Sequence, residues 1–240
     1  MRRSPTNPPQ LFHLTGGAGV VSFCYYAGRA VTRAFFTHAC RYQVQGREHV
    51  PREGGVILAA NHTSYLDPPL VGSAVRRPIH FMAKAELFGV PALGWFIARA
   101  HAFPVHRGAA DRRALRTAVQ LLRQGEVLLI FPEGTRSPDG RLMPAELGVG
   151  IIALRSGAPV VPVAHTGADR VLPRGTPLLR PAKIRVRIGP PLRFDHLAGR
   201  AGDRDALQQV AHRVTQAIAA LLPPSRISPQ VASPSQEAEG

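Results

Sequence analysis

Short apolar runs of strand length alternate with segments of helical periodicity through the middle of this 240-residue chain. The run Val56–Ala60 is apolar without interruption, which is typical of a buried strand. After Asp111, a plausible N-cap, apolar residues instead recur at helical spacing until Gly125. Strands that alternate with helices predict an α/β fold with a mixed, largely parallel central sheet flanked by helices. We expect strands at 42–45, 56–60, 79–83, 101–106, 127–131, 159–164 and 184–188, and helices at about 111–125, 148–156 and 203–222.

The composition divides the chain into a central domain and two different ends. Residues 1–40 begin with a proline-rich stretch, expected to be flexible, and continue as a helix from about residue 18. Residues 41–222 are long enough to bury a core and form the main domain. Residues 223–240 are rich in Pro, Ser, Gln and Glu, so we expect a disordered tail.

The helix expected near the N-terminus carries an apolar stripe beside two arginines, Arg29 and Arg33. This pattern suits an amphipathic helix that associates with a membrane surface, and that is the role we expect. The alternative is a helix that packs on the domain and exposes its arginines to solvent. We do not expect a membrane span, because the nearest candidate, residues 18–28, is shorter than the roughly 18–20 residues needed. We also do not expect a cleaved signal peptide.

Basic residues outnumber acidic ones by 30 to 15, which gives a formal net charge of +15. Such a chain attracts anionic lipid, phosphorylated small molecules or nucleic acid. The sequence has no RNA-binding sheet signature, zinc knuckle or helix-turn-helix pattern. We therefore expect an anionic membrane surface or a phosphorylated substrate, and no nucleic acid. The two cysteines, Cys24 and Cys40, lack the spacing of a metal site and fit a reducing compartment.

The segment Asn61–Asp67 follows the strand at 56–60 directly and precedes two prolines that are typical of a helix start. It contains a histidine, which is well matched to proton transfer near neutral pH, and a carboxylate that can orient it. In a continuous helix, residues five positions apart lie about 140° apart. We therefore expect His62 in the turn and Asp67 at the helix entrance, where Asp67 would also serve as N-cap. No G-x-S-x-G elbow accompanies them, so we expect His62 and Asp67 to activate a hydroxyl of the substrate.

A second polar turn, Phe131–Ser137, follows another expected strand. Its side chains and main chain offer a carboxylate acceptor, free amides, a hydroxyl and a cationic fork, a combination that suits a phosphate group. The carboxylate can also accept a hydrogen bond from a substrate hydroxyl. The residues that we expect to bind the substrate here are Glu133, Gly134, Thr135 and Arg136.

Three further segments carry weaker signals. Arg107 follows the strand at 101–106 and is expected to hold the same phosphate, although an arginine exposed to solvent would give the same pattern. Pro162 within an expected strand implies a sheet edge or a bulge, with a role in shaping the pocket wall or in structure alone. The largely apolar segment from Lys84 to Arg99 could line an acyl groove, enter a membrane interface or form a plain buried helix.

In this order, the motifs resemble those of the 1-acylglycerol-3-phosphate acyltransferase family, also called lysophosphatidic acid acyltransferases. The resemblance covers about residues 40–190. Asn61-His62 with Asp67 matches the family's first motif, a histidine and an aspartate separated by four residues. The later motifs correspond to Phe103–Gly108, Phe131–Ser137 and Val161–Val163.

The resemblance implies a glycerolipid acyltransferase-like domain and a complete reaction. His62, paired with Asp67, would deprotonate the free hydroxyl of lysophosphatidic acid. The alkoxide would attack the thioester of acyl-CoA or acyl-carrier protein and give phosphatidic acid, without an acyl-enzyme, a metal or a cofactor. Arg107 and residues 133–136 would bind the glycerol and the phosphate. The protein is expected at the cytoplasmic face of the cell membrane, as a peripheral or monotopic enzyme of phospholipid biosynthesis.

Three positions depart from the family pattern: His101 stands where members often have Gly, His106 where many have Asp, and Glu146 where related sequences often carry Lys. The reversed charge at Glu146 bears on the acceptor more than on the reaction class. The alternatives are an acyltransferase for another lysophospholipid or aminolipid, a thioesterase, and an inactive basic membrane-binding protein. The intact catalytic pair and the phosphate-type arginines argue against the last two.

Overall fold

The computed structural model describes residues 18–106, 111–176 and 178–232, with side chains from Tyr25 onward. Within these residues, seven strands form one sheet in the order β1-β7-β6-β2-β5-β3-β4. All neighbouring strands are parallel except β6 and β7, so the predicted mixed, largely parallel sheet is confirmed. The strands lie where the sequence predicts them: β1 (Gln43–Gln45), β2 (Val56–Ala60), β3 (Ile79–Lys84), β4 (Ala102–Val105), β5 (Val127–Ile130), β6 (Val160–Thr166) and β7 (Arg185–Ile188).

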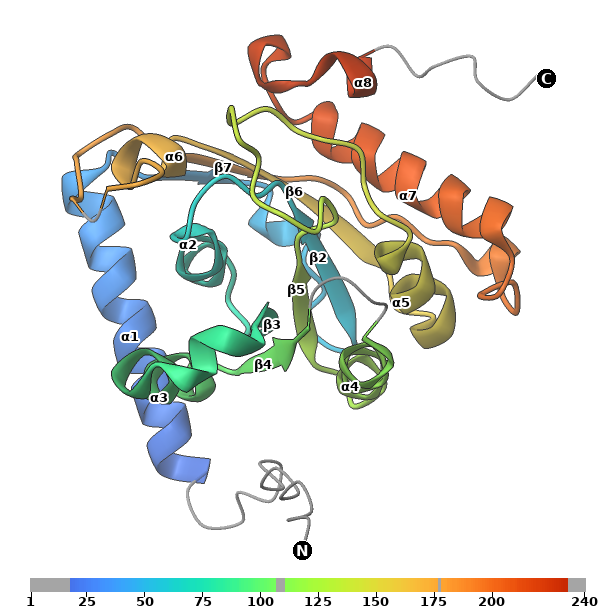
Figure 1. Ribbon diagram of the computed structural model, residues 1–240, viewed down its shortest axis with the longest axis horizontal. Coiled ribbons are helices and arrows are strands. Elements are labelled where there is room, and N and C mark those ends of the chain that lie inside the picture. Colours follow the sequence, from blue (N-terminus) through green and yellow to red (C-terminus); the bar gives the residue numbers. More distant parts are fainter. Residues whose placement is uncertain (1–17, 107–110, 177, 233–240) are drawn as a thin grey trace, which may run out of the picture.

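Helices cover both faces of the sheet (Figure 1). On one face lie α1 (Ala18–Ala39) and α2 (Asp67–Ala74), with α3 (Pro91–Arg99) beside α1. On the other face lie α4 (Arg112–Arg123), α5 (Gly148–Ser156) and α7 (Arg204–Ala219). The shorter elements are η1 (Arg47–His49), η2 (Ala85–Gly89), α6 (Ala168–Val171), η3 (Asp195–Leu197), η4 (Pro224–Arg226) and α8 (Pro229–Ala232).

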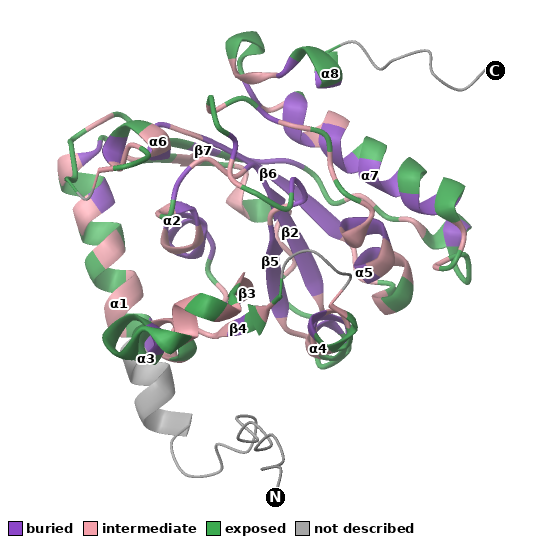
Figure 2. Ribbon diagram, in the orientation of Figure 1, coloured by how far each residue is buried: buried purple, intermediate pink, exposed green. Residues whose placement is uncertain are grey.

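The sheet separates two apolar cores, because successive side chains of a strand point to opposite faces. On β2, Ile57 and Ala59 pack with the cluster that includes α4, α5 and α7, whereas Leu58 and Ala60 pack with that of α1 and α2. Every residue of β2 is fully buried, as the uninterrupted apolar run predicts. Figure 2 shows that α7 buries the side that faces the sheet and exposes the side that faces away from it.

Of the two alternatives for Pro162, the sheet edge is wrong and the bulge is confirmed. Its strand, β6, lies inside the sheet between β2 and β7. The carbonyl of Pro162 accepts the N–H of Gly189 at 2.9 Å, and Gly189 comes just after the last residue of β7. Val160 then pairs with Leu192, so Val161 and Pro162 lie opposite three residues, 189–191, and the missing N–H of Pro162 falls at this bulge.

α1 packs firmly on the domain through aromatic and basic side chains. The hydroxyl of Tyr25 accepts the N–H of Ile79 at 2.9 Å. The guanidinium of Arg29 donates to the carbonyls of Val75 and Arg76, beyond the end of α2. The alternative in which this helix exposes both arginines is therefore wrong for Arg29. None of the helices within the described residues combines the length and the apolarity needed to cross a membrane.

The expected disordered tail is wrong for residues 223–232, which fold onto the domain. The guanidinium of Arg226 donates to the carboxylate of Asp169 at 2.8 Å. Val231 is buried in the same cluster as α7. A polar composition misled the prediction because main-chain hydrogen bonds to Leu142, an ion pair and two apolar side chains, Ile227 and Val231, hold this short segment against the domain. Residues 233–240 lie outside the described residues.

Candidate active site

Two polar turns meet at one edge of the sheet. β2 and β5 are neighbours and run parallel, so the turns that follow them emerge side by side. In α/β proteins, this carboxyl edge of the strands is where ligands bind. The first turn carries His62 and Asp67, and the second carries Glu133 and Arg136.

His62 and Asp67 are hydrogen-bonded to each other. The Nδ1–H of His62 donates to Oδ2 of Asp67 at 2.8 Å. The same oxygen accepts the main-chain N–H groups of Thr63 at 2.7 Å and Ser64 at 2.8 Å. Asp67 is fully buried, whereas 13% of the His62 side chain is exposed. The predicted arrangement, with the histidine in the turn and the carboxylate at the helix entrance, is the one observed.

The N-cap role expected of Asp67 is wrong. Asp67 is the first residue of α2, the N-cap position belongs to Leu66, and no side chain caps this helix. The carboxylate points back to the preceding turn instead and accepts hydrogen bonds from the N–H groups of Thr63 and Ser64. One side chain thus orders the turn that carries His62 and orients its ring.

The imidazole of His62 is held in the state that a general base requires. Its ring stacks on Phe131 with the ring centroids 4.0 Å apart. Burial lowers the pKa of His62 below its ordinary value, and the hydrogen bond to Asp67 opposes that shift. The ring is therefore neutral near pH 7, and because Nδ1–H faces Asp67, Nε2 carries the lone pair that can accept a proton.

The second turn forms hydrogen bonds with both the main-chain N–H and the main-chain carbonyl of His62. Oε1 of Glu133 accepts the N–H of His62 at 2.7 Å, and the N–H of Ser137 donates to the carbonyl of His62 at 2.8 Å. Oε2 of Glu133 accepts the N–H of Met143 at 3.0 Å. Glu133 is only 4% exposed, and burial raises its pKa to about 7. In this structure Glu133 positions His62, and its direct contact with a substrate hydroxyl stays a prediction.

The other predicted substrate-binding residues lie in the same turn or outside the described residues. Gly134 adopts φ 67°, a conformation that favours glycine. Thr135 and Arg136 line a groove next to His62. The guanidinium of Arg136 lies 3.7 Å from the ring centre of Tyr65, a cation–π contact. Arg107 falls in the segment 107–110, which lies outside the described residues, so its role stays a prediction.

A groove of about 690 Å³ leads away from His62 between α1, α2, β3 and α3. Its lining is predominantly apolar, as expected of a site for a hydrocarbon chain. Cationic side chains lie along it as well. The apolar residues along it include Phe81, Met82, Leu87, Leu93, Phe96 and Ile97, and the cationic ones are Arg29, Lys84, Arg99, Arg136 and Arg174.

The segment from Lys84 to Arg99 is a groove wall and not a plain buried helix. Within α3, Gly94 is the one buried residue. Trp95 and Phe96 are more than half exposed, at 56% and 53%. Of the three alternatives for this segment, a groove lining and an interfacial helix therefore remain, and the same helix can serve as both.

Sequence reasoning missed two residues at this edge. Arg174 lines the groove together with Arg136, but it lies in an irregular loop after α6 where no motif drew attention to it. His165 lies near the end of β6, buried, with its Nε2 3.5 Å from Oδ1 of Asp67. Its strand had been predicted, but the sequence gives no sign that β6 lies next to β2.

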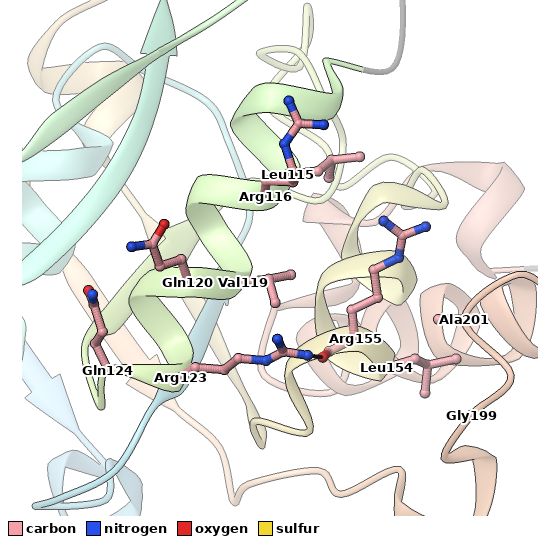
Figure 3. Close-up of a pocket in the computed structure, with 10 residues that line it drawn as sticks. All are labelled: Leu115, Arg116, Val119, Gln120, Arg123, Gln124, Leu154, Arg155, Gly199 and Ala201. Atoms are coloured by element: carbon pink, nitrogen blue, oxygen red, sulfur yellow. Dashed lines mark hydrogen bonds between the residues drawn. The ribbon is translucent and has the colours of Figure 1, made fainter. Parts of the chain in front are cut away.

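A second groove, of about 680 Å³, lies on the other face of the sheet between α4, α5 and the loop at 199–201 (Figure 3). Arg116, Arg123 and Arg155 line it, and the Arg123 guanidinium donates to the carbonyl of Arg155 at 2.9 Å. None of the predicted site residues lines this groove. It is therefore separate from the candidate active site.

The family described as Acyltransferase matches residues 41–166. A 1-acyl-sn-glycerol-3-phosphate acyltransferase of Bacillus subtilis (strain 168) is 34% identical over 174 residues, which cover 70% of this chain and 84% of that protein. The chain spans a smaller share, 44%, of the chloroplastic enzyme BAT2 of Brassica napus, to which it is 33% identical over 155 residues.

Two further relatives bear on the acceptor and the fold. A lyso-ornithine lipid O-acyltransferase of Pseudomonas aeruginosa is 34% identical over 177 residues, covering 66% of this chain and 67% of that protein. The crystal structure of the 1-acyl-sn-glycerophosphate acyltransferase PlsC from Thermotoga maritima superposes with a TM-score of 0.66. That structure is 29% identical in sequence, and the match covers 84% of this chain and 79% of that one.

Proposed function

We propose, because this chain belongs to the acyltransferase family, that it transfers a fatty acyl group from a thioester to the free hydroxyl of 1-acylglycerol-3-phosphate and forms phosphatidic acid. The observation that carries the proposal is the hydrogen-bonded pair of His62 and Asp67 beside an apolar groove that has Arg136 in its lining. Relatives of that named activity, such as the Bacillus subtilis enzyme, support the choice of acceptor.

The chemistry follows from the protonation state of His62. Nε2 takes the proton of the lysolipid hydroxyl while the oxygen attacks the thioester carbonyl, and Asp67 stabilises the imidazolium that forms. The tetrahedral intermediate then expels the thiolate, which receives the proton back from Nε2. An ester forms, a thioester breaks, and no acyl-enzyme is required. The donor is acyl-CoA or acyl-carrier protein, and the reaction needs no metal or cofactor.

The acceptor's phosphate fits the cationic part of the groove. Arg136 stacks on Tyr65, and its guanidinium makes no hydrogen bond among the described residues, so the N–H groups at its edge can bind a phosphate. Arg174 lines the same groove from a different element. Thr135 adds a hydroxyl donor in the same turn, whereas the amide of Gly134 donates to the carbonyl of Phe131 at 3.1 Å. Arg107 belongs to the same proposal as a further phosphate ligand.

A second candidate acceptor is an amine-bearing lysolipid. Glu146 is exposed, and its carboxylate lies against Gly134, where any side chain would collide with it. A carboxylate in this place repels a phosphate and attracts an ammonium group. The similarity to a lyso-ornithine lipid O-acyltransferase points the same way.

We place the enzyme on the membrane surface, at the cytoplasmic face, without a span. The exposed apolar residues of α3 and of the preceding turn are Val90, Leu93, Trp95 and Phe96. Arg99 stacks over Trp95 at 4.0 Å, so an aromatic ring and a cation are presented together, as is common at the headgroup level of a bilayer. The neighbouring helix α1 adds Tyr26 and Val31, which are 51% and 69% exposed. An anionic surface would attract this basic chain.

The test is acyl transfer by the purified protein in mixed vesicles. Lysophosphatidic acid, lyso-ornithine lipid and no acceptor are compared, each with acyl-CoA and with acyl-carrier protein as donor. We expect phosphatidic acid from the first acceptor. Preferential acylation of lyso-ornithine lipid would support the second candidate instead. Thioester cleavage with no acylated lipid in any arm would contradict the transferase proposal.

A further inference from the structure

A second histidine, His165, lies directly beside the turn that carries the catalytic pair. β6 and β2 run parallel with Val163 opposite Ala60, so His165 is level with the first residues after β2. It is 1% exposed. A buried imidazole is costly unless its polar atoms find partners, so the contacts of this ring identify what it stabilises.

His165 and Asn61 are joined by three hydrogen bonds. The N–H of His165 donates to Oδ1 of Asn61 at 2.8 Å, and Nδ2 of Asn61 donates to the carbonyl of His165 at 3.1 Å. The third bond joins Nε2 of His165 to the main-chain carbonyl of Asn61 at 2.7 Å. Because a carbonyl only accepts, Nε2 carries the proton. The residue before His62 is thus fixed through both its side chain and its main chain.

The same Nε2–H lies 3.5 Å from Oδ1 of Asp67. Oδ2 of Asp67 accepts three hydrogen bonds, whereas Oδ1 has no hydrogen-bond partner among the described residues. The His165 ring is therefore the polar group next to the otherwise unsatisfied oxygen. Asp67 lies between two histidines, with His62 on one oxygen and His165 near the other.

The His165 ring is neutral. Its Nδ1 is buried and has no hydrogen-bond partner among the described residues. A protonated ring would bury an unsatisfied Nδ1–H, which folded proteins avoid. A neutral His165 offers one N–H dipole to Asp67 without competing for its negative charge, which stays available to His62.

We infer that His165 is a positioning residue for the reaction: it holds Asn61 by three hydrogen bonds, its Nε2–H lies beside the outer oxygen of Asp67, and it thereby fixes His62 for proton transfer. The inference rests on the proposed function because it takes His62 as the base. This positioning role differs from the pocket-wall role that the sequence suggested for the same strand, because His165 does not line the groove.

The loss of the Nε2–H donor has a definite consequence for His62. The ionisable groups that face the pair are His165 from β6 and Glu133 and Arg136 from the turn after β5. The Nε2–H dipole of His165 points its positive end toward the outer oxygen of Asp67, and without it the carboxylate would hold the imidazolium more strongly. Without the donor, the pKa of His62 therefore rises, and the acid limb of kcat/KM moves to higher pH.

Two amide variants separate this role from packing. In His165→Gln, the amide nitrogen reaches the place of Nε2, whereas in His165→Asn the same amide is one methylene shorter and does not reach it. Val163→Ala, on the same buried strand, serves as the control for a general loss of packing. We expect Asn to lower kcat by about tenfold or more, the scale on which outer partners of functional histidines act. Gln should restore most of the rate, and acceptor KM should change little in both.

The readout that separates the outcomes is the titration of the His62 ring by NMR in the free enzyme, with its signal assigned through His62→Ala. The Asn variant should show a raised pKa of His62, and the Gln variant and Val163→Ala should not. Asn and Gln variants that both titrate like the wild type, with equal kcat, would overturn the inference. This titration needs no acyl transfer, so an inactive wild type would count against the proposed function and leave the positioning test intact.

Discussion

The carboxylate of Glu133 accepts the main-chain N–H of His62 at 2.7 Å, so the second polar turn holds the histidine that we propose as the base. The other oxygen of Glu133 accepts the N–H of Met143. One carboxylate thus joins the backbone at Met143 to the backbone of His62, which lies far away in the sequence. The motifs at 61–67 and 131–137 form a single site because of such links, and each link can be tested.

Glu133→Ala leaves the N–H groups of His62 and Met143 without an acceptor in a buried place. We expect the free energy of unfolding to fall by about 1–3 kcal/mol and kcat to fall with it, while acceptor KM changes little. Urea unfolding and steady-state kinetics measure the two effects. Glu53→Ala, an exposed acidic residue that precedes β2 and so lies at the opposite end of that strand from the site, is the control. A large rise in acceptor KM at constant kcat would instead favour the direct substrate contact predicted from the sequence.

The raised pKa of Glu133 makes stability depend on pH. Its folded-state pKa is about 7, against an ordinary value of 4.5. Between these values the folded state retains a proton that the unfolded state loses, so this contribution is complete below about pH 4.5 and lost as pH rises through about 7. The wild type should therefore lose at most about 3 kcal/mol relative to Glu133→Gln from pH 4.5 to 8. If the difference in the free energy of unfolding between the wild type and Glu133→Gln stayed constant across this pH range, Glu133 would be ionised throughout.

Arg136→Ala should weaken the binding of the acceptor more than the binding of the donor. Loss of a charged hydrogen bond to phosphate costs about 1.5–3 kcal/mol, which corresponds to a rise of roughly tenfold or more in acceptor KM. Arg155→Ala removes an arginine from the remote groove of Figure 3 and is the matched control, with no expected change in either KM. Equal effects of the two substitutions would mean that Arg136 acts only through the net charge.

Membrane association is expected to depend on the exposed aromatic residues of α3. The double substitution Trp95→Ala with Phe96→Ala removes two side chains that are mostly exposed, so the fold should tolerate it. Flotation with anionic vesicles should show binding that is at least about tenfold weaker, because each buried ring contributes on the order of 1–2 kcal/mol. Leu178→Ala with Leu179→Ala, exposed elsewhere, is the control. Equal flotation of both double variants would locate the membrane contact away from α3.

The sequence predicts the strands well because their apolar runs are short and bounded, as at Val127–Ile130. It does not predict which strands are neighbours, and the contact between His165 and Asp67 depends on β6 lying beside β2. The cap role of Asp67 was wrong because the helix begins one residue earlier than assumed, which turns its carboxylate toward the preceding turn. Composition likewise gave no sign that Val231 would anchor the segment after α7.

His101, one of the departures from the family pattern, has an unusual backbone conformation. His101 adopts φ 64°, a conformation that favours glycine, the residue that related sequences often carry there. In this chain the ring stacks between Tyr25 of α1 and His80 of β3, with centroids 4.7 Å and 4.8 Å away. The stacking offsets the strain of the backbone and adds to the docking of α1.

The central claim is that His62, held by Asp67, is the base of the reaction. The most direct measurement is single-turnover acyl transfer from a radiolabelled thioester to lysophosphatidic acid by His62→Ala, with folding checked by circular dichroism. The account predicts a folded protein that binds both substrates and forms no phosphatidic acid above the background without enzyme. Phosphatidic acid formed by the folded variant at a rate near that of the wild type would contradict it.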